Sequence, residues 1–445
     1  MRIKIGDREI FYNSIKNLLD VDMNIQRLNA ITFDSRNVEK GDIFIALSGE
    51  NSDGHNFIHE CLDKGASLII NEKIKADNII KVKSSKETLS KLASLYRSQM
   101  SCRVIGITGS NGKTTTKELL AHILHGSYRI SYTKENYNST IGMPMSLFAI
   151  KKSDEIFIAE IGTNKKGEIK YLSDIAKPDM ALITNISESH LSNLINLNGV
   201  FEEKINLFKA LPQDGIAFIN MDDKFLSKLK KDIQYNHITF GFNGDWHFNA
   251  STRKGSNSLV INGDKVIIPD SSNLHLYNVL STFSICATLG VEIEDFNQKL
   301  NLFETPSGRG NLIYINQFII VNDTYNANYG SVVSGLRKLS NMRANHRKLI
   351  VLGDMLELGK NEKQIHKNLY DHINHNKFYR TYLYGSLMHE LFLETKKQKT
   401  ENDIRYYENQ EELINELQTT LKPKDILYIK GSRGMKMENI IKGVA

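Results

Sequence analysis

A glycine-rich segment followed by a lysine and a threonine has the composition of a phosphate-binding loop. Residues 104–118 read VIGITGSNGKTTTKE. The apolar run at residues 104–107 predicts a strand, and the periodicity of residues 117–124 predicts a helix after the loop. Backbone N–H groups in such a turn, together with the positive end of the helix, attract phosphate. In this geometry Lys113 reaches the terminal phosphates, and the Thr114 hydroxyl is available to Mg²⁺.

Three further polar residues follow predicted strands or lie on a predicted helix in the middle of the chain. Strands such as residues 156–159 and 180–183 alternate with helical stretches, which favours a parallel sheet with ligands at the carboxyl ends of its strands. Glu160 ends the first of these strands, where a carboxylate is well placed to hold Mg²⁺. By residue type alone, His190 after the second strand is a solvated loop residue, and Lys204 in a helical stretch is a surface lysine.

The first hundred residues contain polar turn residues around a short apolar strand. Residues 34–49 read DSRNVEKGDIFIALSG, and residues 53–57 read DGHNF. The guanidinium of Arg36 is suited to pairing with a phosphate. The residues alone favour a surface turn over a binding site.

Three polar clusters follow predicted strands in the last part of the chain. They are residues 322–328 (NDTYNAN), 353–359 (GDMLELG) and 430–438 (KGSRGMKME). The strands alternate with helices as in a Rossmann-like sheet, but no G-x-G-x-x-G follows the first strand, so a dinucleotide cofactor is not expected. Asp and Asn are also common in plain turns, so the residues alone leave a turn and a ligand site equally open.

Length and composition set broader limits. A chain of 445 residues predicts roughly three domains, and its 40% hydrophobic content is that of a globular protein. The net charge of +6 is spread along the chain, so nucleic acid is not an expected partner. Three scattered cysteines fit a reducing cytosol. Because there is no signal peptide and no run of about 20 apolar residues, we expect a cytoplasmic protein without membrane insertion.

These motifs together resemble one enzyme family. The loop T-G-x-x-G-K-T, with Ile107 where general phosphate loops have glycine, is the variant of the Mur ligases and the folylpolyglutamate synthases. The pattern AEIG…GEI…P…ITNIxxxHL over residues 159–191 resembles the central domain of the Mur ligases, and DSR…DGHxF resembles their N-terminal domain. D-x-Y-N-A-N, L-G-D-M-x-E-L-G, K-G-S-R-x-x-x-M-E and the segment at residues 303–311 resemble the D-alanyl-D-alanine-adding branch.

The resemblance implies an α/β fold with the three-domain Mur ligase architecture. A small N-terminal α/β domain, residues 1–99, would bind the UDP-muramoyl peptide. A central P-loop ATPase domain with a mostly parallel sheet would occupy residues 100–306. A C-terminal Rossmann-like domain, residues 307–445, would complete the ligase. The chain is expected to work as a monomer.

The resemblance also assigns roles to residues. It implies ATP, two Mg²⁺ ions and a carbamylated Lys204, with metal ligands Thr114, Glu160, His190 and Lys204. Catalytic residues would be Lys113, Glu160, His190, Lys204, Arg309 and Asp323. Nucleotide contacts would be Gly109, Ser110, Asn111, Gly112, Lys113, Thr114, Thr115, Asn138, Asn278, Arg309, Asp323, Tyr325 and Asn326. Contacts to the other substrates would be Ser35, Arg36, Asn326 and Asn328.

The implied reaction is an ATP-dependent amide ligation in peptidoglycan precursor synthesis. UDP-N-acetylmuramoyl-tripeptide would be activated as an acyl phosphate and then coupled to D-alanyl-D-alanine, and closure of the third domain would bring in Arg309 and Asp323. Two alternatives stay open: a Mur-type ligase with another amine or carboxylate, and a non-catalytic nucleotide-binding relative. The third residue of the peptide, diaminopimelate or lysine, is also open.

The chain departs from the family pattern at several positions. Ser139 replaces the last asparagine of an N-x-N-N loop, and Tyr329 replaces a proline. In the adenine-side stretch at residues 272–278, Leu274 and His275 replace the usual His and Asn, so we expect rearranged contacts to the base.

Overall fold

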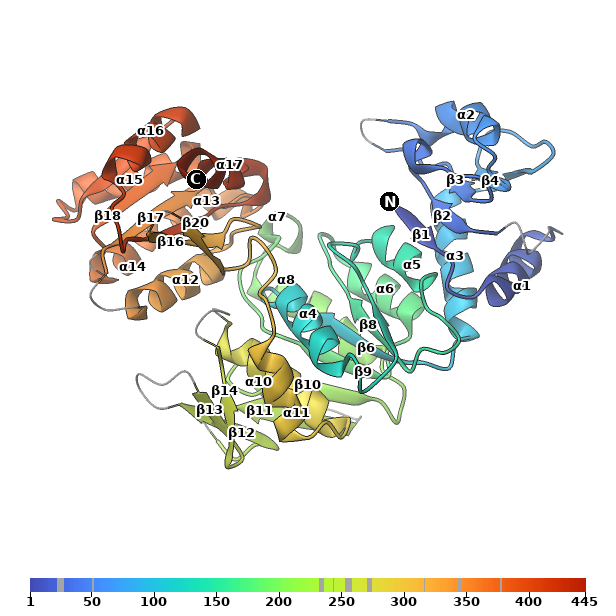
Figure 1. The fold of residues 1–445 in the computed structure, drawn as a ribbon, viewed down its shortest axis with the longest axis horizontal. Helices are drawn as coiled ribbons and strands as arrows, with labels where there is room; N and C mark the ends of the chain where they lie inside the picture. The colour runs from blue at the N-terminus through green and yellow to red at the C-terminus, as the bar shows by residue number, and fades with distance from the viewer. Residues whose placement is uncertain are drawn as a thin grey trace.

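Three β-sheets, each with its own helices, follow one another along the chain (Figure 1). The structure, a computed structural model, describes all residues except 22–27, 50–51, 232–235, 243, 253–257, 270–273, 316, 343–345 and 377. Most neighbouring strands in each sheet run parallel, as predicted for an α/β chain. Among the described residues, no helix is both long and apolar enough to cross a bilayer. The boundaries at residues 99/100 and 306/307 stay predictions.

The first sheet has five strands in sequence order, β1-β2-β3-β4-β5, and only β1 is antiparallel to its neighbour. Two of its helices begin at side-chain caps: Asp7 accepts a hydrogen bond from the N–H of Ile10, and Ser84 accepts one from the N–H of Glu87. The elements are β1 (Arg2–Lys4), α1 (Arg8–Leu19), β2 (Ala30–Thr32), η2 (Ser35–Asn37), β3 (Ile43–Ile45), η3 (Gly54–Phe57), α2 (Ile58–Asp63), β4 (Leu68–Asn71), β5 (Ile79–Lys81) and α3 (Ser85–Ser98).

The central sheet has nine strands in the order β14-β13-β12-β11-β10-β9-β6-β8-β7. Its strands are β6 (Arg103–Thr108), β7 (Ile130–Tyr132), β8 (Ile156–Glu160), β9 (Met180–Ile183), β10 (Ile216–Asn220), β11 (Asn236–Gly241), β12 (Phe248–Thr252), β13 (Ser258–Ile261) and β14 (Asp264–Ile267). Its helices are α4 (Lys113–Leu124), α5 (Gly142–Leu147), α6 (Glu168–Ala176), α7 (Leu191–Leu194), α8 (Leu197–Lys204), α9 (Asn206–Lys209), η4 (Leu226–Lys231), α10 (Leu276–Thr288) and α11 (Ile293–Asn301).

The strands β11 to β14 were not predicted from the sequence. In β12, β13 and β14, buried residues are flanked along the strand by more exposed ones, so these strands are buried on one face only. Ala250, Leu259, Ile261 and Val266 are fully buried in the core shared with α10. A search for continuous apolar runs, which finds the central parallel strands, does not detect this half-buried pattern.

The third sheet has the order β15-β16-β20-β17-β18-β19, with only β15 antiparallel to its neighbour. Because β20 lies between β16 and β17, the three polar clusters that follow these strands meet at one edge. The elements are β15 (Asn311–Ile315), β16 (Phe318–Asp323), α12 (Tyr329–Asn341), β17 (Lys348–Gly353), η6 (Gly359–Asn361), α13 (Glu362–Lys367), α14 (Leu369–Asn376), β18 (Arg380–Tyr384), α15 (Ser386–Lys397), β19 (Ile404–Tyr407), α16 (Gln410–Thr420), β20 (Ile426–Lys430), η7 (Arg433–Met435) and α17 (Glu438–Val444).

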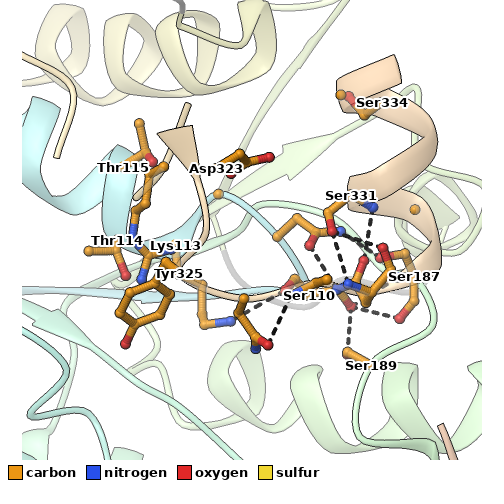
Figure 2. A pocket seen from close by; sticks show the side chains of 18 of the residues that line it. Ser110, Lys113, Thr114, Thr115, Ser187, Ser189, Asp323, Tyr325, Ser331 and Ser334 are labelled. Atoms are coloured by element: carbon orange, nitrogen blue, oxygen red, sulfur yellow. Dashed lines mark hydrogen bonds between the residues drawn. The ribbon is translucent and has the colours of Figure 1, made fainter. Parts of the chain in front are cut away.

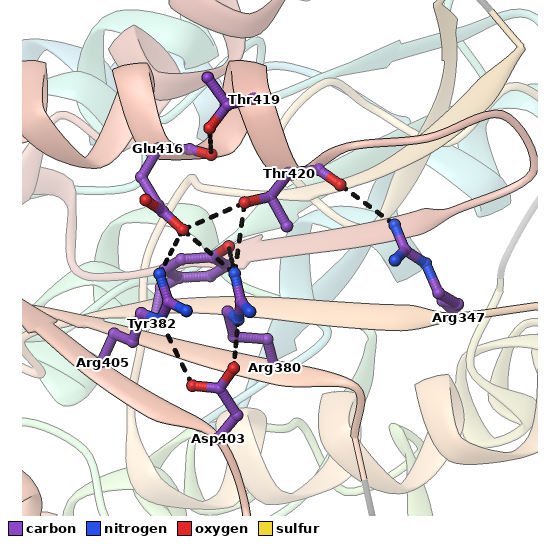
Figure 3. A network of polar contacts seen from close by, with 8 residues as sticks. All are labelled: Arg347, Arg380, Tyr382, Asp403, Arg405, Glu416, Thr419 and Thr420. Atoms are coloured by element: carbon purple, nitrogen blue, oxygen red, sulfur yellow. Dashed lines mark hydrogen bonds and ion pairs between the residues drawn. The ribbon is translucent and has the colours of Figure 1, made fainter.

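An ion-pair network occupies the opposite edge of the third sheet (Figure 3). Arg380 pairs with Asp403 at 2.5 Å and with Glu416 at 3.1 Å, and Arg405 pairs with the same two carboxylates. Thr420 donates a hydrogen bond to Glu416. The network joins the starts of β18 and β19 to α16. Every charge in it has a partner, so we interpret it as structural.

Buried hydrogen bonds attach the first sheet and its helices to the central part. The hydroxyl of Tyr96 on α3 donates to the carbonyl of Ile150 at 2.6 Å and accepts from the N–H of Asp7 at 2.8 Å. Its ring packs edge-on against Phe11 and Phe148. The buried guanidinium of Arg97 donates to the carbonyl of Ala176 at 3.0 Å.

We expect Tyr96→Phe to lower the free energy of unfolding by about 1–3 kcal/mol, since two buried polar groups lose their partner. Tyr314→Phe is the matched control, because Tyr314 lies on the surface and is 61% exposed. Urea unfolding followed by tryptophan fluorescence and circular dichroism measures both variants. Equal unfolding midpoints for the two variants would contradict the prediction.

Candidate active site

The phosphate loop lies between β6 and α4 and requires two of its glycines. Gly109 and Gly112 have φ values of 147° and 83°, which non-glycine residues rarely adopt. A Cβ atom on Gly109 would lie 1.9 Å from Oγ1 of Thr184, and one on Gly112 would lie 2.5 Å from Oδ1 of Asn278. The loop therefore keeps this conformation only with glycine at both positions.

Lys113, the first residue of α4, folds back over this loop. Its Nζ donates to the carbonyl of Gly109 at 2.6 Å. Burial lowers the pKa of Lys113, and the Glu160 carboxylate partly offsets this effect. A bound phosphate would therefore replace the Gly109 carbonyl as the hydrogen-bond acceptor of this amine.

Glu160 is a buried carboxylate beside the loop, and it is only partly satisfied. Its Oε1 accepts hydrogen bonds from the hydroxyl of Thr114 at 2.9 Å and from Nδ2 of Asn138 at 2.7 Å. Among the described residues, its Oε2 has no hydrogen-bond partner, and Nζ of Lys117 lies 3.6 Å away. A buried carboxylate oxygen without a donor, next to a threonine hydroxyl, fits the oxygen ligands of Mg²⁺.

His190 and Lys204 lie close enough to Lys113 for its charge to act on both of them. Nδ1 of His190 is 2.9 Å from Oε2 of Glu357, which belongs to the loop after β17. Burial, together with Lys113 and Lys204, lowers the pKa of His190 against the opposing effect of Glu357. Lys204 is 1% exposed, and its amine forms no hydrogen bond or ion pair with any described residue. Burial lowers the pKa of Lys204 well below its usual range.

The predicted metal ligands do not form a closed cage. Within the part of the chain that the structure describes, no three His, Cys, Asp or Glu side chains are grouped as metal ligands. Mg²⁺ commonly binds through one or two carboxylates together with waters and substrate phosphates. Glu160 and Thr114 fit such an arrangement, in which the nucleotide supplies the remaining oxygens.

The third sheet supplies the opposite wall. Oδ2 of Asp323 accepts from the hydroxyl of Tyr428 at 2.8 Å and from Nζ of Lys430 at 2.7 Å. The guanidinium of Arg309 lies 3.9 Å from the ring centre of Tyr325. This wall places the Asp323 carboxylate and the Lys430 amine at the carboxyl ends of β16 and β20, and the Arg309 guanidinium lines the same cavity.

One cavity of about 710 Å³ connects the two walls (Figure 2). Nδ2 of Asn328 crosses it to donate to Oδ1 of Asn111 at 2.8 Å. Most of the predicted site residues line this cavity, and they come from both the central and the third part of the chain: Ser110, Asn111, Gly112, Lys113, Thr114, Thr115, Asn138, Glu160, His190, Asn278, Arg309, Asp323, Tyr325, Asn326 and Asn328.

Four predicted residues lie elsewhere. Gly109 belongs to the loop backbone, and Lys204 is buried and does not line the cavity. Ser35 and Arg36 lie on η2 of the first part, outside the cavity. The exposed guanidinium of Arg36 pairs with Asp34 at 2.7 Å, so the substrate role of these two residues stays a prediction.

Several cavity residues were not assigned to the site from the sequence. A chain of hydroxyls links Ser110 with Ser189 at 3.1 Å and with the backbone of Ser187 (Figure 2). Lys430 is the first residue of the K-G-S-R motif. Its position at the end of a predicted strand was the sequence feature that could have identified it as a site residue. Lys117 does not line the cavity but is buried beside Glu160, and in the sequence it resembles any other helical lysine.

The altered adenine-side stretch also faces the cavity. Leu274, His275 and Tyr277 line it, and Nζ of Lys338 from α12 donates to the carbonyl of Leu274 at 2.9 Å. Burial lowers the pKa of Lys338 to about 7. Residues 272 and 273 of this stretch lie outside the described part of the chain.

Comparison with protein families covers nearly the same three parts. The family profile described as Mur ligase middle domain matches residues 107–286, and that described as Mur ligase, glutamate ligase domain matches residues 308–433. A third, Mur ligase family, catalytic domain, matches residues 27–97. The chain belongs to the Mur ligase family. The predicted three-domain Mur ligase architecture is thereby confirmed.

Individual Mur ligases are similar over nearly the full length. The UDP-N-acetylmuramoyl-tripeptide–D-alanyl-D-alanine ligase of Bacillus subtilis is 31% identical over 93% of this chain and 93% of its own. The structure of MurF from Acinetobacter baumannii aligns with a TM-score of 0.87 at 27% identity, covering 97% of this chain and 98% of that one. MurF from Thermotoga maritima in complex with ADP aligns with a TM-score of 0.83 at 28% identity, covering 93% and 96%. These relatives belong to the branch that the C-terminal motifs indicated.

We expect Gly112→Ala to weaken binding of ATP by about tenfold or more, because a Cβ at this left-handed position displaces Asn278 and the loop. Gly126→Ala is the matched control: Gly126 has a φ of 89°, a Cβ there would have nothing within 4 Å, and the residue lies outside the cavity. Calorimetric titration with ATP and Mg²⁺ measures both. An equal loss of affinity in the two variants would show that backbone strain alone is responsible.

Proposed function

We propose that this chain is an ATP-dependent ligase that joins D-alanyl-D-alanine to UDP-N-acetylmuramoyl-tripeptide. The observation that carries the proposal is the single cavity that places the phosphate loop opposite the polar clusters of the third domain. Relatives that cover almost the whole chain carry the name of this activity. The motifs of the third domain, which separate this branch from other Mur ligases, line that cavity.

The proposed reaction has two steps. An oxygen of the tripeptide's terminal carboxylate attacks the γ-phosphorus of ATP, the bond to the β,γ-bridging oxygen breaks, and ADP leaves. The dipeptide's amine then attacks the acyl carbon, the C–O bond to phosphate breaks, and the amine loses a proton as the amide forms. The first step brings two anions together, so it requires cations at the reacting atoms.

The residues of the cavity meet this requirement from both sides. Lys113 supplies a cation to the terminal phosphates, and Arg309 supplies another from the third domain. Bound Mg²⁺ would be held by Thr114 and Glu160 and would withdraw charge from the phosphate oxygens. A cavity with walls from two domains also keeps water away from the acyl phosphate once the domains close on the substrates.

We also propose that Lys204 works as a carbamate. Its burial and lowered pKa favour the neutral amine, which is the form that attacks CO₂. A bond forms between Nζ and the carbon of CO₂, and a proton passes to solvent. The product is an anionic oxygen ligand of the kind that Mg²⁺ prefers, and with His190 it would help hold a second ion.

The remaining predictions belong to the same proposal. Ser35 and Arg36 would contact the UDP end of the peptide substrate, and Asn326 and Asn328 would contact substrate in the cavity. A monomer is supported because one chain supplies both walls of the cavity. The cytoplasmic location rests on the sequence alone.

The function is tested by phosphate release from ATP with UDP-N-acetylmuramoyl-tripeptide, with and without D-alanyl-D-alanine. We expect release and amide product only when all three are present, and at least about a 100-fold loss of rate in Lys113→Ala, since a cation at the reacting phosphate is removed. Lys166→Ala, at an exposed position, is the control. No product with all three reactants, or full activity of Lys113→Ala, would refute the proposal.

The carbamate is tested separately. We expect Lys204→Ala to lose roughly 10–100-fold in activity and to be rescued by short-chain carboxylates, which restore an anionic oxygen in the vacated space. Addition of ¹³C-bicarbonate should give a carbamate carbon resonance in the unmodified protein that is absent in Lys204→Ala. Lys209→Ala, five residues further along and exposed, should behave as wild type. A wild-type spectrum without this resonance would rule the carbamate out.

A further inference from the structure

The loop after β17 contacts the central domain at His190, one of the predicted metal ligands. Oε2 of Glu357 lies 2.9 Å from Nδ1 of His190. The carbonyl of the same glutamate accepts a hydrogen bond from the N–H of Ser192 at 3.3 Å. A Cβ on Gly359 would lie 3.3 Å from the backbone of Ser192, so this loop packs closely on α7.

The two residues of this contact have unusual backbone conformations. Glu357 has a φ of 65° and His190 a φ of 53°, both in the left-handed region. Such conformations cost about 1–2 kcal/mol for non-glycine residues and persist where the surroundings hold them. Glu357 and His190 face each other between the two domains, and both have this costly conformation. This indicates that the fold fixes the position of both side chains.

We propose that Glu357 is a positioning residue that orients His190 for metal binding when the third domain docks. The inference rests on the proposed function, since it concerns one of the metal ligands that this function requires. A carboxylate that accepts from Nδ1–H fixes the tautomer of the imidazole and leaves the lone pair of Nε2 for a metal ion. His190 and Glu357 both line the cavity, so the oriented ring borders the space where the phosphates would bind.

The charges around His190 support this assignment. The charged groups that act on its ring are Lys113, Lys204 and Glu357. Both lysines belong to the central domain, and the glutamate is the one acidic group among the three. Separation of the third domain would leave the ring beside two amines without its carboxylate partner. Docking therefore changes the environment of His190 directly.

The pair is better suited to orientation than to holding the domains together. The side chain of Glu357 is 61% exposed and that of His190 is 22% exposed. A pair this open to solvent contributes about 0–1 kcal/mol to docking. The angular constraint on the ring does not depend on that energy, because partners that hydrogen-bond to a metal ligand act by fixing its geometry.

The test uses Mn²⁺ as the probe, titrated into the full-length protein with a non-hydrolysable ATP analogue and followed by electron paramagnetic resonance. We expect Glu357→Ala to weaken Mn²⁺ binding by about 10–100-fold and Glu357→Gln, which keeps an acceptor oxygen, to lose less. Glu362→Gln is the matched control, since Glu362 lies five residues further along and forms no ion pair among the described residues. Thermal midpoints should be equal in all variants.

A double-mutant cycle with His190→Ala separates orientation from a general structural effect. If Glu357 acts through His190, Glu357→Ala has no further effect on Mn²⁺ affinity once the imidazole is gone. Additive losses, or wild-type Mn²⁺ binding in Glu357→Ala or in His190→Ala, would overturn the inference. The metal readout requires no turnover, so a failure to form the peptide product would refute the proposed function and leave this result standing.

Discussion

The site is built around one buried negative charge. Glu160 ends β8 inside the protein, where a carboxylate is costly unless donors or cations surround it. Thr114 and Asn138 satisfy one oxygen, and Lys117 approaches the other without reaching hydrogen-bond distance. The second oxygen thus keeps its capacity to bind a cation. The glycines of the phosphate loop and the strand order of the central sheet bring the phosphates to this carboxylate.

The third domain contributes by topology. Insertion of β20 between β16 and β17 collects its polar clusters at one sheet edge, which faces the carboxyl edge of the central sheet. Asn328 and Lys338 donate hydrogen bonds to the central domain, and Glu357 accepts one from His190. Each of these residues meets the central domain at a different part of the cavity wall. The shape of the cavity therefore depends on how the third domain is docked.

The sequence predicted those features that short segments determine. The phosphate loop and Glu160 were found because a strand, its end and the following helix lie within a few residues. Lys430 and Glu357 belong to polar clusters that follow predicted strands, but what they contact depends on the order of strands and on domain docking, which no local pattern contains. Lys204 was proposed as a site residue only through family resemblance, since its burial cannot be read from a helical stretch with charged neighbours.

The attachment of the first domain through Tyr96 has a consequence for substrate length. Its hydroxyl bridges α1 and the segment after α5, so the distance between the first sheet and the phosphate loop is set by the fold. A molecule held by its nucleotide end in the first domain must be long enough for its carboxylate to reach Lys113. Shorter precursors with the same nucleotide would bind at one end and stop before the phosphates. The protein would then select its nucleotide-linked substrate by the length of the molecule as well as by its chemical groups.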